Sequence, residues 1–172
     1  MNTAQGVLII GGGIAGMATA IELRKRGVAV DLVEIDPEWR VYGAGITIGG
    51  AALRAFKTLG VLPEIAAQGW CSDGCDLCAP DGTVMATLPT PRIAGPEIPG
   101  SGGILRPVLA RILSKATLAS GTAVRLGVTF TKIEPSDEAV EVRAFDRAEL
   151  PWDELAFWST EQALRDAFGA TR

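Results

Sequence analysis

Apolar and polar positions in the first part of the chain follow the order of a β–α–β unit. Residues 6–10 form an apolar run typical of a buried parallel strand, and residues 28–34 predict a second strand. Residues 14–26, between them, predict a helix that ends in basic residues followed by Gly27. The apolar side chains of this helix fall on one face: Ile14, Met17, Ala18 and Ile21. We expect the unit to be right-handed.

Two later stretches have the period of amphipathic helices. Residues 50–59 predict one helix, and another is expected from Arg106-Pro107 to a residue just before Gly121. Pro63 is suited to the first turn of a short helix between them. Apolar side chains line one face of each longer helix: Leu53, Phe56 and Leu59 in the first, and Leu109, Ile112, Leu113 and Ala116 in the second.

The remaining segments predict strands and loops. Residues 75–79 and 83–88 are expected to form two strands joined by a turn at Pro80-Asp81-Gly82. Residues 89–103 hold four prolines and four glycines and predict a loop, while Gly43-Ala44-Gly45-Ile46 predicts a flexible segment. Three further strands are expected over residues 122–126, 128–133 and 139–145.

Composition narrows the classes of protein that fit. The chain has 172 residues, 48% of them hydrophobic, which suits one globular domain with a core. The net charge of -4 and the lack of a basic cluster argue against nucleic acid and membrane as partners. The uncharged run over residues 7–21 is too short to span a bilayer and is broken by glycines, so a cytoplasmic location is expected. The absence of histidine excludes His-dependent triads, which leaves a cofactor or carboxylates for any chemistry.

The loop after the first strand carries glycines at G-x-G-x-x-G spacing. It is Gly11-Gly12-Gly13-Ile14-Ala15-Gly16, and Glu34 ends the second strand eighteen residues after its last glycine. The first glycine permits a sharp turn, the second leaves room for a pyrophosphate, and the third lets helix and strand pack closely. Amides at the helix N-terminus would face the phosphates, and Glu34 would accept hydrogen bonds from a ribose. The alternative is a plain glycine-rich turn.

We therefore predict an α/β fold with a Rossmann-like, FAD/NAD(P)-binding parallel sheet and a small inserted antiparallel sheet. The charges near the loop bear on the ligand, since Glu34 and Asp36 would repel the 2′-phosphate of NADP. No arginine follows Glu34 directly. These charges do not separate FAD from NAD.

Three cysteines have a spacing that also occurs in metalloproteins. Cys71, Cys75 and Cys78 form C-x3-C-x2-C, the spacing of radical-SAM iron–sulfur proteins. Leu77 stands where that motif usually has an aromatic residue, and the chain is too short for that family's barrel. A zinc site would lack a fourth ligand of the usual kind. We expect three half-buried cysteines at the entry to a hairpin, and no metal site.

Three segments beyond the glycine loop resemble segments of a known protein family, and they occur in the same order and with the same spacing as in that family. They are Arg40-Val41-Tyr42-Gly43-Ala44-Gly45-Ile46, the helix over residues 50–59 with its Leu59-Gly60-Val61, and Arg106-Pro107-Val108-Leu109. With the glycine loop and Glu34, they make residues 5–145 resemble the N-terminal part of FAD-dependent class A monooxygenases. This is the aromatic-hydroxylase group related to p-hydroxybenzoate hydroxylase.

The resemblance implies that the cofactor is FAD, with NAD less expected and NADP least. The pyrophosphate would lie on the glycine loop and the adenosine ribose on Glu34. Arg40 and Arg106 would contact the phosphate and ribityl parts. Gly43-Ala44-Gly45 would lie near the flavin ring, and the backbone at Phe130 would meet the adenine. Both arginines have a structural alternative, because a lone surface arginine is often simply solvated.

The chain departs from the family pattern near its end. The family's Asp-Gly pair is missing, and Trp152–Trp158 stands where the strand before it should lead in. The sequence stops before the third motif and most of the substrate domain. We therefore expect an apparently truncated protein, with an FAD-binding domain over residues 1–150 and a divergent tail over residues 151–172. Within that tail, Ser159 to Gly169 predicts a short capped helix.

The predicted function is that of an FAD-binding module of an FAD-dependent oxidoreductase, monooxygenase-like but incomplete and inactive as an isolated chain. NAD(P)H and a small organic substrate would be partners if further sequence completes the protein. Two alternatives stay open. One is a non-catalytic nucleotide-binding or regulatory module, and the other is an inactive remnant that acts only as an interaction protein. The sequence offers no residue to name as a catalytic base.

Overall fold

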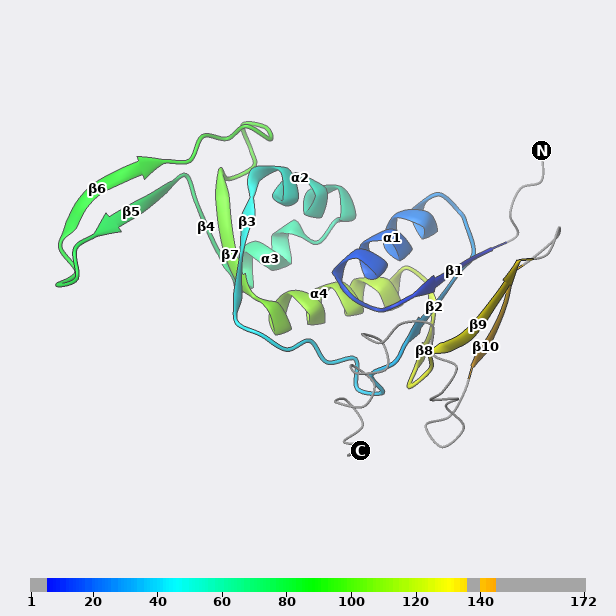
Figure 1. Ribbon diagram of the computed structural model, residues 1–172. Helices are drawn as coiled ribbons and strands as arrows, with labels where there is room; N and C mark the ends of the chain where they lie inside the picture. Colours follow the sequence, from blue (N-terminus) through cyan, green and yellow to red (C-terminus); the bar gives the residue numbers. More distant parts are fainter. Residues whose placement is uncertain (1–5, 136–139, 145–172) are drawn as a thin grey trace, which may run out of the picture.

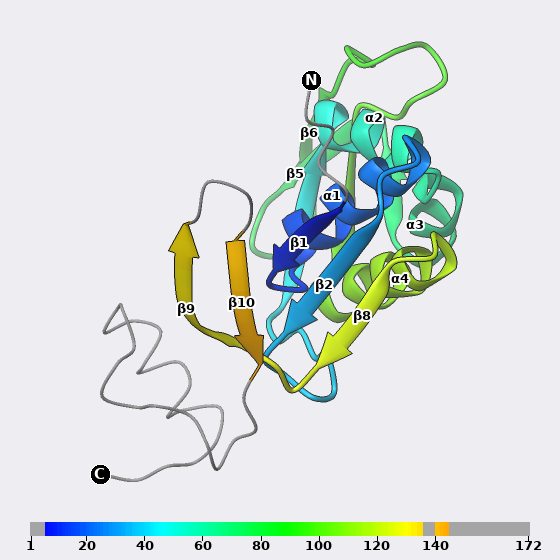
Figure 2. The same cartoon turned by 90° about the vertical axis from the view of Figure 1, so that its right-hand side faces the viewer.

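A three-stranded parallel sheet carries the glycine loop. The structure is a computed structural model that describes residues 6–135 and 140–144. The strands are β1 (Val7–Ile10), β2 (Val30–Glu34) and β8 (Ala123–Leu126), hydrogen-bonded in the order β1-β2-β8. Both pairings are parallel, so the carboxyl ends of the three strands meet at one edge of the sheet (Figures 1 and 2).

A layer of helices packs against this sheet. Helix α1 (Ile14–Lys25) joins β1 to β2, and α4 (Arg106–Ala119) leads into β8. Figure 2 shows both helices on the same face of the parallel sheet. Helices α2 (Gly50–Leu59) and α3 (Leu62–Gln68) lie farther from it, against the second sheet (Figure 1).

The second sheet is antiparallel and lies on the far side of the helices. It contains β3 (Gly45–Gly49), β7 (Ser101–Leu105) and β4 (Trp70–Ser72), in the order β3-β7-β4. Two hairpins stand at opposite ends of the molecule in Figure 1, and the one next to the antiparallel sheet projects away from the body. They pair β5 (Gly74–Cys78) with β6 (Val84–Pro89), and β9 (Phe130–Pro135) with β10 (Val140–Ala144).

The main hydrophobic core lies between the helices and the antiparallel sheet. It takes inward side chains from all four of these helices and from β3 and β7, which ties the two layers together. Its fully buried members include Met17, Leu53, Ile65, Ile98, Leu109, Ile112 and Leu113. A smaller core of Ala20, Val30 and Leu32 joins α1 to the parallel sheet. Helix α1, which begins at the glycine loop, therefore packs into two separate apolar clusters.

The sequence predicted most of this architecture. The α/β class is confirmed, with the Rossmann-like parallel sheet and the small antiparallel sheet. The helix predicted over residues 50–59 is α2, and the predicted hairpin turn contains Gly82 at φ +88°. Gly27 and Gly121, predicted to follow helix ends, have φ values of +77° and +81°.

Several local predictions are wrong. The strand at residues 6–10 is only half-buried, and Ile10 is 42% exposed, because β1 pairs only with β2 among the described residues. The segment Gly43–Ile46, predicted to be flexible, contains the start of β3. The loop predicted over residues 89–103 ends earlier, because β7 begins at Ser101. β3 and β7 pair with each other, and the sequence analysis found neither them nor β4.

Some predictions fall on residues that the structure does not describe. The domain boundary at residue 150, the segment Trp152–Trp158 and the short helix from Ser159 to Gly169 lie outside the described residues. Among residues 6–135 and 140–144, no helix has the length and apolar character needed to cross a membrane.

Candidate functional site

Three glycines shape the loop between β1 and α1, each for a different reason. Gly11 has φ +101°, which side chains rarely adopt, and its N–H donates to the carbonyl of Val33 (2.8 Å). A Cβ on Gly16 would lie 2.0 Å from the carbonyl oxygen of Gly11, so only glycine lets α1 pack against the loop. At Gly13, the position of a Cβ has no described atom within 4 Å, so this side of the loop is open.

The N-terminus of α1 offers uncapped amides at the open side of the loop. Gly13 is the N-cap residue, no side chain caps the helix, and its first turn holds no acidic residue. The first amides of a helix have no intrahelical acceptor, and the helix dipole places partial positive charge there. This end of α1 is therefore suited to bind an anion such as a phosphate.

Glu34 lies beside this loop with a fixed carboxylate. Its Oε2 accepts a hydrogen bond from the Gly12 N–H (2.6 Å), and its Oε1 accepts one from the Asp36 N–H (2.9 Å). Each oxygen keeps a further lone pair for a ligand hydroxyl. The structure thus brings the predicted acid and the predicted loop together.

The predicted adenine contact lies at the same edge of the sheet. The Val128 N–H donates to the backbone carbonyl of Glu34 (3.0 Å), which ties the segment after β8 to the end of β2. Phe130 follows at the start of β9 and is half-buried. The segment that leads to Phe130 therefore begins beside the end of β2.

Trp39 is a residue of this site that the sequence analysis missed. Its indole Nε1–H donates to the carbonyl oxygen of Gly12 (2.7 Å), from a loop that follows β2. The only available signal in the sequence is Gly12 itself, a fourth glycine in the loop, at a position where the motif does not require one.

Arg40 is held by its own loop. Its guanidinium pairs with Asp36 (Nε to Oδ2, 3.1 Å) and with Glu38 (Nη1 to Oε2, 3.2 Å), and it lies 5.7 Å from the ring centre of Tyr42. Partial burial alone would raise the pKa of Asp36, but hydrogen bonds from Arg40 and from the Glu38 amide outweigh it and lower that pKa. The pKa of Arg40 is raised by the same pairing with Asp36.

Arg106 and the predicted flavin-side glycines form a second cluster. The Arg106 N–H donates to the carbonyl of Ala44 (3.1 Å), and β3 pairs Gly45 with Leu105. A Cβ on Gly43 would lie 3.3 Å from Cδ of Arg106, so the arginine stem runs directly over this glycine. Arg106 is exposed and forms no ion pair with the residues that the structure describes.

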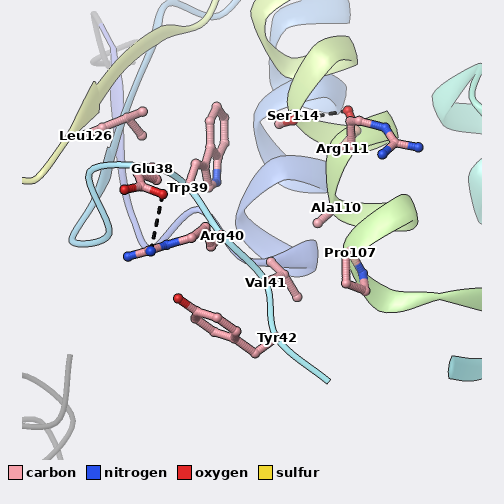
Figure 3. A pocket seen from close by; sticks show the side chains of 10 residues that line it. All are labelled: Glu38, Trp39, Arg40, Val41, Tyr42, Pro107, Ala110, Arg111, Ser114 and Leu126. Atoms are coloured by element: carbon pink, nitrogen blue, oxygen red, sulfur yellow. Dashed lines mark hydrogen bonds and ion pairs between the residues drawn. The ribbon is translucent and has the colours of Figure 1, made fainter. Parts of the chain in front are cut away.

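A groove of about 470 Å³ lies between the loop after β2 and helix α4. Figure 3 shows the segment from Glu38 to Tyr42 on one side of it and α4 on the other. Trp39, which reaches Gly12, and Pro107, which follows Arg106, both line it. The groove's full lining is Glu38, Trp39, Arg40, Val41, Tyr42, Pro107, Ala110, Arg111, Ser114 and Leu126.

The three cysteines occupy two different environments. Cys71 on β4 is half-buried against the main core, and burial raises the pKa of its thiol. Cys75 and Cys78 on β5 are exposed, so the prediction that all three are half-buried is wrong for these two. They belong to a hairpin that projects from the body and therefore lacks neighbours to cover them. Among the described residues, no group of three His, Cys, Asp or Glu is placed to hold a metal ion.

We expect anaerobically purified protein to contain no stoichiometric iron or acid-labile sulfide. A protonated, half-buried Cys71 thiol is a poor metal ligand, because metals bind the thiolate. Iron and sulfide analysis of the parent and of Cys75→Ala measures this directly. One iron or more per chain in the parent, lost in the variant, would overturn the prediction.

A comparison with known families assigns the chain. A family model described as "FAD binding domain" matches residues 4–151, which is most of the sequence. The chain belongs to this family. Its cofactor is FAD, as the resemblance implied.

Two curated relatives of this FAD-binding chain are named as monooxygenases. The putative FAD-dependent monooxygenase YetM of Bacillus subtilis (strain 168) is 32% identical over 161 residues, which cover 93% of this chain and 43% of that protein. The aurachin C monooxygenase/isomerase of Stigmatella aurantiaca is 34% identical over 128 residues, 72% of this chain and 33% of that protein. The chain thus spans less than half the length of these relatives.

Solved structures show the same fold. The p-nitrophenol 4-monooxygenase PnpA from Pseudomonas putida DLL-E4 has a TM-score of 0.67 at 21% identity, over 86% of this chain and 37% of that one. The flavin-dependent monooxygenase PieE, solved in complex with FAD and substrate, has a TM-score of 0.66 at 21% identity, over 86% of this chain and 28% of that one. At this identity the likeness concerns the fold alone.

Proposed function

We propose that this chain is the FAD-binding module of a monooxygenase-like oxidoreductase, and that it binds FAD in an extended form along the edge described above. One observation carries the proposal: the uncapped N-terminus of α1 and the fixed carboxylate of Glu34 meet at the Gly12 amide. An anion site and a ribose acceptor side by side are what a dinucleotide requires.

The individual roles follow from the placement of the side chains. The amides after Gly13 would bind the pyrophosphate, and Glu34 would accept hydrogen bonds from the adenosine ribose through its remaining lone pairs. The backbone near Phe130, at the same edge of the sheet, would contact the adenine.

The other half of the cofactor would lie toward the second cluster. Arg40, on the groove, and Arg106, at the start of α4, supply positive charge for the phosphate and ribityl parts. An arginine in the first turn of a helix opposes the helix dipole, so a nearby phosphate gives Arg106 a reason for its position. Gly43-Ala44-Gly45 presents almost no side chain, which lets a flat ring approach the backbone.

Bound FAD would supply the redox chemistry. None of this chain's residues is proposed as a catalytic base. For a protein that further sequence completes, we propose that the electron donor is NAD(P)H and that the substrate is a small organic molecule. The support is the curated relatives, which are monooxygenases more than twice as long as the matched region. A cytoplasmic location remains a prediction from the sequence.

Titration of the apoprotein with FAD, NAD and NADP tests the proposal. We expect FAD to bind most tightly, because only FAD reaches both clusters, and NADP most weakly, because Glu34 would repel its 2′-phosphate. Glu34→Gln keeps the length of the side chain but removes its charge, so the gap between NAD and NADP should narrow. Tighter binding of NAD than of FAD would contradict the flavin assignment.

Visible absorption of the purified protein separates the remaining possibilities. A flavin spectrum supports the proposed module. A bound nucleotide with no flavin would favour a non-catalytic nucleotide-binding protein. Folded protein that binds neither flavin nor another nucleotide would favour the inactive remnant.

A further inference from the structure

Trp39 is held in an unusual conformation at the base of the glycine loop. It has φ +51°, the single positive value among the described non-glycine residues, and a conformation of this kind persists only where its surroundings enforce it. Its half-buried indole packs against both apolar clusters. Its Nε1–H is directed at the carbonyl oxygen of Gly12, 2.7 Å away. The indole therefore links the core of the protein to the loop.

The indole also explains why residue 12 is glycine. A Cβ at this position would lie 2.4 Å from Nε1 and 2.9 Å from Cε2 of Trp39. The G-x-G-x-x-G motif itself makes no demand here, since position 12 is its first variable residue. Gly12 and Trp39 are thus matched to each other by contact.

The peptide groups around Gly12 are held on both sides. The Gly12 N–H donates to Glu34, and the Gly12 carbonyl accepts from Trp39. In a trans peptide, the N–H of the next residue points away from that carbonyl. Fixing the carbonyl of Gly12 on the indole therefore directs the Gly13 N–H to the opposite side, away from Trp39. A Cβ on Gly13 would also have no described atom within 4 Å, so there is open space beside this residue.

We propose that Trp39 is a positioning residue for the cofactor: its indole sets the orientation of the Gly12–Gly13 peptide, so that the Gly13 amide faces the pyrophosphate before the cofactor arrives. The inference rests on the proposed FAD site. Trp39 acts through Gly12, and its effect is pre-organisation, because a loop that is already ordered loses less entropy on binding.

Trp39→Phe tests the hydrogen bond with the least change in packing. The probe is ADP, which carries the ribose and pyrophosphate but lacks the flavin ring, and its dissociation constant is measured by calorimetry on the 172-residue chain. We expect about fivefold weaker binding, the factor that corresponds to one net hydrogen bond. Trp70→Phe is the matched control: Trp70 is 57% exposed on β4, so its replacement should leave ADP binding unchanged.

A double-mutant cycle separates positioning from general stability. Gly12→Ala should weaken ADP binding about tenfold or more, because its methyl group collides with the indole. Trp39→Leu removes the colliding atoms along with the donor, so adding Gly12→Ala in that background should change affinity less than twofold. A purely structural role would give losses of affinity that follow the losses in melting temperature from one variant to the next.

The outcomes distinguish the two proposals. If Gly13→Val abolishes ADP binding while Trp39→Phe binds as the parent does, the site stands and the role of Trp39 is wrong. If Gly13→Val has no effect on ADP binding, the proposed site itself is wrong. Additive effects of Gly12→Ala and Trp39→Leu would also overturn the inference.

Discussion

Gly13→Val is expected to weaken FAD binding about a hundredfold or more without unfolding the protein. Gly13 has φ -71° and ψ 179°, which valine adopts readily, and no described atom lies within 4 Å of the added Cβ. The isopropyl group would instead fill the space in front of the first amides of α1. A pyrophosphate approaching those amides would meet a side chain where the parent has only backbone.

Gly49→Val is the matched control for this experiment. Gly49 is the N-cap of α2, has φ -77° and ψ 166°, and has equally open space around it. The two variants therefore add the same side chain at the same helix position. Quenching of FAD fluorescence gives the affinity and circular dichroism gives the melting temperature. Equal affinity of Gly13→Val and the parent would show that the loop does not bind the cofactor.

The parts of this fold that the sequence predicted are those encoded locally. The glycine loop follows from a strand, three glycines and a helix within a few residues of one another, and each of the glycines at positions 11, 13 and 16 has its own visible reason. The helices follow from their apolar periodicity. The acid at Glu34 follows from a fixed distance along one β–α–β unit, so no long-range contact had to be foreseen.

Strands β3 and β7 of the antiparallel sheet were missed because they are rich in glycine. Local propensity assigns such segments to loops, and only the pairing of β3 with β7, far apart in the chain, makes them strands. Gly102 shows why glycine is needed there: a Cβ would lie 2.9 Å from the carbonyl oxygen of Trp70 on the neighbouring strand. The close approach of the strands is a property of the folded protein and has no local signature.

In the candidate site, too, locally encoded features were predicted and features that depend on long-range contacts were missed. Trp39 was missed because its role depends on a contact with Gly12, 27 residues earlier in the chain. Arg40 was predicted as a site residue through resemblance alone, and its ion pairs with Asp36 and Glu38 are a local feature that the resemblance did not reveal. A ligand phosphate would have to compete with these two carboxylates for the same guanidinium.

The 172-residue chain, loaded with FAD, is expected to reduce oxygen to hydrogen peroxide and to hydroxylate nothing. The residues proposed to lie near the flavin ring, Gly43, Ala44 and Gly45, are all exposed to solvent, and so is Arg106 beside Gly43. FAD bound at such an open site would supply two-electron chemistry with the balance NADPH + H⁺ + O₂ → NADP⁺ + H₂O₂. Transfer of an oxygen atom requires a site that excludes water and holds the substrate.

The measurement supplies reduced nicotinamide, oxygen and a panel of phenolic substrates, and follows oxygen consumed, peroxide formed and oxygenated product. Peroxide should account for nearly all of the oxygen consumed. Gly13→Val is the control, because a chain that cannot hold FAD should consume oxygen no faster than free FAD does at the same concentration. The contrary result is oxygenated product in close to a one-to-one ratio with the oxygen consumed. It would show that the exposed cluster around Arg106 is sufficient to shield the flavin. The proposed division between a cofactor module and a substrate-binding sequence would then be wrong.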